Sequence, residues 1–165
     1  MKEKLKYYLK EIVVFSILLF VATNAISFYK STELTKENFP LSQITLYDNT
    51  SFSYDKNKPI LLHFWTTWCP TCKIEASTIN ALSKDYQVIT VVVKAKNKAQ
   101  IQNYLKKNNL SFNVIDDKNG TLATQFHIPA YPTTLIYNTQ QNLIFSEVGY
   151  SSTIGLKIRL WLATF

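Results

Sequence analysis

The two cysteines of the chain, Cys69 and Cys72, are separated by only Pro70 and Thr71. A structural disulfide stabilises a fold chiefly by closing a long loop, and the loop between these cysteines is very short. The pair is therefore better suited to redox chemistry or metal binding than to holding a fold together. In the redox case one thiolate attacks a disulfide, and the second thiol then resolves the mixed disulfide.

The residues around the pair predict a strand followed by a helix. Residues 59–65 are apolar except for His63, which is typical of a strand buried on both faces of a central sheet. After Cys69 the pattern becomes helical. The side chains expected to face the core from this helix are Ile74, Ile79 and Leu82.

A helix that begins at Cys69 would assist the chemistry. Its N-terminus carries a partial positive charge and free N–H groups, which stabilise a thiolate, and proline is tolerated in the first turn. Cys69 is therefore predicted to be the nucleophile. Cys72, one turn later on the same face, is predicted to be the resolving thiol.

The remaining segments alternate between strand and helix patterns. They predict an α/β fold with a central mixed sheet flanked by helices, because alternating elements give a parallel core and a late hairpin adds antiparallel strands. The expected elements are a hairpin within 43–54, strands at 87–93, 112–115, 133–137 and 143–148, and helices at 99–109, 120–127 and 153–165.

The N-terminal residues have a different composition. Residues 1–11 are rich in lysine, and residues 12–28 form an apolar run near the lower length limit of a membrane-spanning helix. We expect a cytoplasmic basic leader at 1–11, an uncleaved transmembrane signal-anchor at 12–28, a linker at 29–39 and the domain at 40–165. A removed signal peptide, cleaved after Ala25, is the alternative.

The lysines before the apolar run also predict the orientation. Positive residues stay in the cytoplasm, so the protein is expected to be a single-pass protein of the inner (cytoplasmic) membrane, with its domain in the periplasm. The formal net charge of the 165 residues is +7, and part of it lies in the leader. The remaining basic residues form no stripe of the kind that binds nucleic acid.

Two segments resemble the thioredoxin superfamily. Phe64–Lys73 is similar to the active-site run of that superfamily, and Ile128–Thr134 is similar to the loop that carries its cis-proline. The resemblance implies a thioredoxin-like fold and a protein-disulfide oxidoreductase whose only redox group is the Cys69–Cys72 disulfide, with no cofactor. It also implies that Pro132, preceded by Tyr131, faces the cysteines beside the bound substrate strand.

The resemblance extends to membrane-anchored members. Glu75 matches an acidic residue that tunes the thiols in anchored reductases of the cytochrome c maturation type; an exposed first-turn glutamate is the alternative. Residues 149–161 resemble the anchored thioredoxin-like proteins of suppressor-of-copper-sensitivity systems, hence a link to copper tolerance. These relatives imply protein thiol and disulfide substrates, net reduction, and a transmembrane thiol reductase as electron donor.

Several residues leave alternatives open. His63 stands where the family often has a buried acid, and is either a hydrogen-bonded core residue or a proton relay to Cys72. Trp65 is expected in the core, and Trp68 at the rim as a shield and substrate platform. Pro70, directly after the first cysteine, is also found in oxidising relatives, so an oxidant of the same class is an alternative.

Two further function classes compete with disulfide exchange. A Cu(I) chaperone could use the two sulfurs as soft ligands, although Met1 is the only methionine and neither histidine is close in sequence. A redox-inactive adhesion or scaffold module would need neither cysteine.

Overall fold

The computed structural model describes residues 10–15, 18, 39 and 43–165. Residues 10–15 are helical, but most of the predicted anchor, leader and linker lies outside the described residues. Within the described part of the chain, no helix is both long enough and apolar enough to cross a membrane. The transmembrane signal-anchor at 12–28 therefore stays a prediction.

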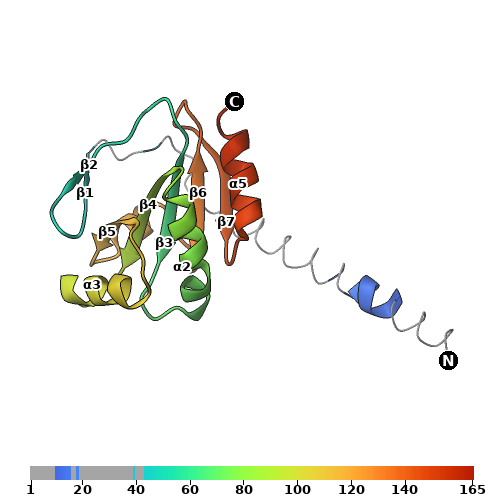
Figure 1. The fold of residues 1–165 in the computed structure, drawn as a ribbon, viewed down its shortest axis with the longest axis horizontal. Coiled ribbons are helices and arrows are strands. Elements are labelled where there is room, and N and C mark those ends of the chain that lie inside the picture. Colours follow the sequence, from blue (N-terminus) through green and yellow to red (C-terminus); the bar gives the residue numbers. More distant parts are fainter. Residues whose placement is uncertain (1–9, 16–17, 19–38, 40–42) are drawn as a thin grey trace.

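The centre of the domain is a five-stranded sheet in the order β5-β4-β3-β6-β7 (Figure 1). Strands β3, β4 and β5 are parallel, and β6 and β7 are antiparallel to their neighbours. Every residue of the central strand is buried, as the apolar run predicted. The strands are β3 (Ile60–Trp65), β4 (Gln87–Val93), β5 (Asn113–Asp117), β6 (Thr133–Tyr137) and β7 (Leu143–Val148).

Helices cover both faces of this sheet. Leu61 and Trp65 of β3 pack with side chains of α2 (Pro70–Leu82), α3 (Lys98–Lys107) and α5 (Thr153–Leu162). Leu62 and Phe64 point the other way and pack with α4 (Thr121–Gln125) and the residues that follow it. This alternation confirms the mixed sheet flanked by helices, which is a thioredoxin-like arrangement.

The predicted N-terminal hairpin is also present. Strands β1 (Ile44–Thr45) and β2 (Ser51–Phe52) pair antiparallel as a separate two-stranded sheet. The carboxylate of Asp48 accepts hydrogen bonds from the N–H and the hydroxyl of Thr50, at 3.0 and 2.6 Å, which fixes the turn.

One inward assignment in α2 was wrong. Ile74 is 68% exposed, and the buried face of the helix includes Cys72, Glu75 and Ile79. Because residues three and four apart share a helix face, a face that contains Cys72 and Ile79 passes through Glu75 and leaves Ile74 on the opposite side. Three helices, α3, α4 and α5, are also shorter than predicted, and α3 ends before Asn109, whose φ is +53°.

The folded domain extends to Phe39, which the sequence analysis placed in the linker. Its ring is 6% exposed and meets the rings of Tyr54 and Tyr137 edge-on, each at 5.2 Å between centroids. Its N–H donates to the carbonyl of Gln141 in the β6–β7 turn, at 2.9 Å. The chain is thus attached to the sheet at the end where β6 and β7 meet.

We expect Phe39→Ala to lower the free energy of unfolding by about 3 kcal/mol, because it removes a buried aromatic ring. Urea unfolding followed by circular dichroism measures the change. Ile144→Ala, at a half-exposed β7 position, is the control and should change stability far less. Equal stability of Phe39→Ala and the wild type would show that Phe39 contributes nothing to the core.

Candidate active site

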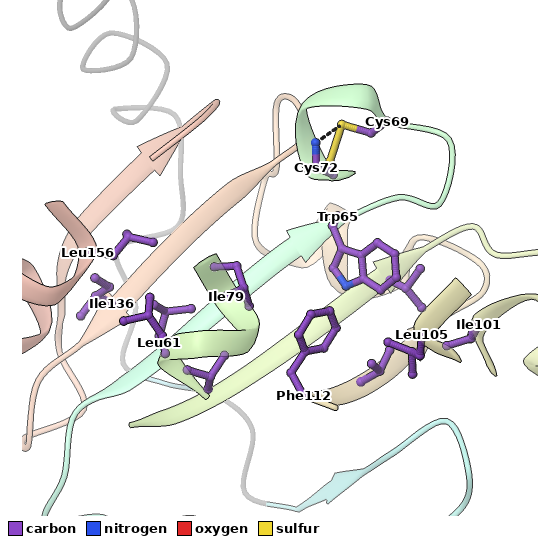
Figure 2. Packing of buried hydrophobic residues seen from close by; sticks show 14 of the residues in the cluster. Leu61, Trp65, Cys69, Cys72, Ile79, Ile101, Leu105, Phe112, Ile136 and Leu156 are labelled. Atoms are coloured by element: carbon purple, nitrogen blue, oxygen red, sulfur yellow. Dashed lines mark hydrogen bonds between the residues drawn. A yellow bond between two sulfur atoms is a disulfide. The ribbon is translucent and has the colours of Figure 1, made fainter. Parts of the chain in front are cut away.

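The cysteine pair lies where the chain passes from β3 into α2. Cys69 is the N-cap of α2 in an extended conformation, and Pro70 occupies the first helical position. The two sulfurs form a disulfide across Cα atoms 5.3 Å apart, and the N–H of Cys72 donates to the sulfur of Cys69 at 3.1 Å (Figure 2). The predicted position of Cys69 at a helix N-terminus is confirmed.

The Pro132 loop closes over the pair, as the resemblance implied. The Tyr131–Pro132 peptide bond is cis, and the carbonyl oxygen of Tyr131 lies 3.6 Å from the sulfur of Cys69. On its other side the loop is held by the N–H of Gly149, which donates to the carbonyl of Pro132 at 2.8 Å. Residues about sixty positions apart in the sequence thus meet at one end of the sheet.

The two tryptophans near the pair occupy the core and rim positions that the sequence predicted. Trp65 is buried and packs against Tyr104, with 4.8 Å between ring centroids. Trp68 is 70% exposed and stands edge-on to Tyr131, at 6.5 Å. The cysteines themselves are buried, so Trp68 and Tyr131 form an aromatic rim beside a covered disulfide.

Glu75 is fully buried one turn beyond Cys72, so the exposed alternative was wrong. One carboxyl oxygen accepts the N–H of Ser151 at 3.1 Å, and the other has no hydrogen-bond partner among the described residues. Burial raises the pKa of Glu75 to about 8, against the lowering effect of the Ser151 N–H. The carboxyl group is therefore mostly neutral at pH 7.

His63 lies on the same face of β3 as Leu61 and Trp65, beneath the α2 layer. Its Nδ1 is 2.9 Å from the hydroxyl oxygen of Thr134 on the neighbouring strand, and the ring is buried. Burial lowers the pKa of His63 to about 3, so the imidazole is neutral at pH 7. These contacts favour the hydrogen-bonded core residue over the proton relay.

The contacts of the Cys69 sulfur within the fold are backbone dipoles. The sulfur receives one backbone N–H at a helix N-terminus, and Glu75 and His63, which are buried in the adjoining core, are neutral at pH 7. Within the described residues, no group of three or more His, Cys, Asp or Glu side chains could hold a metal ion. The arrangement can perform thiol–disulfide exchange, since it combines a stabilised attacking sulfur with an adjacent resolving sulfur.

The partners that hold Glu75 and His63 could not be predicted from the sequence. Ser151 lies in the quoted tail, but nothing in that tail indicates that its N–H points at Glu75. Thr134 lies in the quoted proline loop, 71 positions from His63. Only the register between β3 and β6, which pairs these two residues directly, brings them together.

The stability of the oxidised protein should depend on pH through both groups. Glu75 titrates near 4.5 when unfolded and about 8 when folded, so stability falls as the pH rises between these values. His63 titrates near 6.5 when unfolded and about 3 when folded, so stability falls as the pH drops through that range. The two slopes cancel between pH 4.5 and 6.5.

We therefore expect the free energy of unfolding to be level from pH 4.5 to 6.5 and to decrease on both sides, by at most about 1.4 kcal/mol per pH unit. Glu75→Gln should remove the decrease above pH 6.5. Because only His63 of the two groups then titrates, the level region should also disappear, and the free energy of unfolding should rise with pH from about 3 to about 6.5. Urea unfolding of both proteins across this pH range tests it. A wild-type curve that still rises above pH 6.5 would contradict the buried, neutral Glu75.

The chain is similar to known proteins in sequence and fold. Residues 30–146 match the model of the AhpC/TSA family. A thioredoxin-like protein of Haemophilus influenzae is 34% identical, and the alignment covers 98% of both chains. Sporulation thiol-disulfide oxidoreductase A of Bacillus subtilis is 29% identical over 62% of this chain and 67% of its own length.

The crystal structure of StoA from Bacillus subtilis superposes with a TM-score of 0.61, at 26% identity, over 76% of this chain and 97% of that chain. The disulfide at a helix N-terminus, the proline loop beside it and these relatives agree on one activity, thiol–disulfide exchange. The chain therefore belongs to the AhpC/TSA family within the thioredoxin superfamily, and it is a thiol–disulfide oxidoreductase.

Proposed function

We propose that this protein is a membrane-anchored reductant of disulfides in extracytoplasmic proteins. The observation that carries the direction is that Glu75 and His63, the ionisable side chains buried under the first turns of α2, are neutral at pH 7. Strongly oxidising members of this chemical class owe their potential to a stabilised reduced form, in which the attacking thiolate is held by favourable electrostatics. Here a single N–H and the helix N-terminus supply that stabilisation.

The groups buried nearby do not add to the stability of the thiolate. Glu75 is neutral at pH 7, and when it ionises it places a negative charge one turn from Cys72. His63 stays uncharged to about pH 3, so it supplies no positive charge. Weak stabilisation of the thiolate favours the disulfide form of the protein, and hence the donation of electrons to a client.

In the proposed reaction the thiolate of Cys69 attacks one sulfur of a client disulfide. A mixed disulfide forms, and the other client sulfur leaves as a thiolate that takes up a proton. The thiolate of Cys72 then attacks Cys69, which releases the reduced client and leaves the Cys69–Cys72 disulfide. The backbone beside Pro132, whose neighbouring carbonyl lies 3.6 Å from Cys69, would receive the client strand.

Glu75 is suited to exchange a proton during this cycle. Cys72 loses a proton when it resolves the mixed disulfide, and the ionised fraction of Glu75 can accept it. Cys72 regains a proton when the protein is reduced again, and the neutral form of Glu75 can donate it. The pKa of Glu75, about 8, is close to the ordinary thiol value of about 8.5, so transfer between the two groups is nearly balanced. Its second carboxyl oxygen has no other partner in the described part of the chain.

The composition of the N-terminal residues supports the proposed location. A lysine-rich leader before the apolar run at 12–28 favours a single-pass anchor in the inner membrane, with the domain in the periplasm. A periplasmic reductant must be re-reduced, because the compartment is oxidising. We therefore include a transmembrane thiol reductase as its electron donor.

The separate roles of the two sulfurs can be tested with serine variants. Cys72→Ser should accumulate a mixed disulfide with a disulfide-containing client such as insulin, because no thiol resolves it. Cys69→Ser should trap none and should lose activity by at least about a hundredfold. Non-reducing gel electrophoresis followed by mass spectrometry detects the adducts. Trapping by Cys69→Ser instead would reverse the two assignments.

The direction is tested by the reduction potential of the pair in a glutathione or dithiothreitol redox buffer. We expect a value nearer roughly −270 mV than roughly −120 mV, which are typical of a reductant and an oxidant respectively. The potential of the Glu75→Gln variant should be measured alongside, because glutamine can still accept the Ser151 hydrogen bond but cannot ionise. A wild-type potential near roughly −120 mV would contradict the reductant and support the alternative that the protein is an oxidant, which Pro70 also allows.

A further inference from the structure

Helix α5 is apolar on two opposite faces. One face, with Leu156, Leu160 and the C-cap residue Ala163, is completely buried against the sheet. The other face points to solvent, and we call its large side chains, together with Phe165 just beyond the helix end, the α5 stripe. The stripe consists of Ile154 (73% exposed), Ile158 (53%), Trp161 (58%), Leu162 (44%) and Phe165 (81%).

The spacing of the α5 stripe is that of a single helix face. Its members recur every three or four residues, and Trp161 and Phe165 meet edge-on at 5.2 Å between ring centroids. The basic residues Lys157 and Arg159 fall on the two flanks between the stripe and the buried face. Arg159 forms an ion pair with Glu147 of β7, with 2.6 Å between Nη2 and Oε1. Helix α5 itself contains no acidic residue.

Two other occupants fit the α5 stripe poorly. The segment 29–38 is mostly polar, with Tyr29 and Leu34 as its only large apolar side chains, so it offers little to cover five exposed ones. A second copy packed stripe to stripe would bring the Lys157 flanks of two helices together without an acidic residue in either helix, because Arg159 on the other flank is already paired with Glu147. Such like-charge contacts disfavour self-association and favour an anionic surface.

The chain enters the domain at the end of the sheet toward which α5 runs, although Phe39 packs on the face of the sheet opposite to α5. The chain joins the sheet through Phe39 and Gln141, at the β6–β7 turn. Helix α5 follows β7 and runs back toward this end, so that the C-terminus lies near the same turn (Figure 1). Ten residues separate Phe39 from the apolar run that ends at Phe28, and they span at most about 35 Å.

We propose that the α5 stripe lies on the bilayer that holds the anchor, with its apolar side chains in the headgroup region and Lys157 at the phosphates. This inference rests on the proposed membrane-anchored function. An interfacial helix combines large apolar and aromatic side chains on one face with basic residues at its border, as α5 does. Tryptophan and phenylalanine near the helix end are well suited to that interface.

This contact would also orient the redox centre. The N-terminal end of α5 is bound to α2 through the hydroxyls of Thr78 and Thr153, which lie 2.8 Å apart, and Ser151 beside it binds Glu75. A helix that lies flat on the bilayer therefore keeps the cysteine pair at the side of the domain, close to the membrane plane. A membrane-embedded dithiol donor could reach the pair there without lifting the domain.

Fluorescence quenching of Trp161 in the full chain tests the proposal. The protein is reconstituted into vesicles of phosphatidylcholine and phosphatidylglycerol, with ordinary or brominated acyl chains. Subtracting the spectrum of Trp161→Phe isolates the Trp161 emission from that of Trp65 and Trp68. We expect brominated lipid to remove about half or more of that emission.

Charged substitutions supply matched variants. Ile158→Asp, in the middle of the α5 stripe, should reduce the quenching several-fold. Ile144→Asp, on β7 and outside the stripe, should leave it unchanged. Both should retain insulin reduction, because neither residue belongs to the active site. Near-ultraviolet circular dichroism confirms that each variant is folded.

The outcomes separate this inference from the proposed function. Vesicle-bound protein with equal Trp161 emission in both lipids overturns the bilayer contact and leaves the anchor standing. A dimer in detergent that Ile158→Asp dissociates assigns the stripe to a second copy and likewise overturns it. Failure to associate with vesicles overturns both the anchor and the contact, whereas loss of insulin reduction counts only against the reductant.

Discussion

The packing of α2 against the central sheet is the constraint on which the redox centre depends. Ile79 and Leu82 are completely buried, and they fix both the rotation and the height of the helix over β3. Once these two side chains are placed, the first turn must bring Cys69 to the N-cap and Cys72 onto the buried face. The geometry of the sulfurs is thus a consequence of core packing about two to three and a half helical turns away.

The same rotation places a carboxyl group where a hydrophobic residue would be expected. Glu75 occupies a buried position while Ile74, its neighbour, is exposed. An exchange of these two side chains would favour stability, since burial of a carboxyl group with one unpartnered oxygen is unfavourable. The Ser151 hydrogen bond offsets part of this effect. An unfavourable group retained next to a disulfide is typical of a functional site.

The fold was predictable because each strand has a clear local signal. The bounds of β6 and β7 agree with the predicted 133–137 and 143–148, since β-branched and apolar runs end there in polar turns. The rotation of α2 was not predictable from hydrophobicity, because an isoleucine next to a glutamate suggests the opposite face. The burial of Phe39 depends on Tyr54 and Tyr137, which are distant in sequence.

Those parts of the site that lie within continuous segments were predictable, just as the strands were. Cys69, Cys72, Trp68 and Pro132 lie in two continuous segments, and those segments carry their own signal. The electrostatic character of the site depends instead on how separate segments pack together. Burial between these segments keeps His63 and Glu75 neutral at pH 7, and the charge near Cys69 decides how strongly its thiolate is held. The reaction class therefore follows from local sequence, whereas the direction of electron flow follows from tertiary contacts.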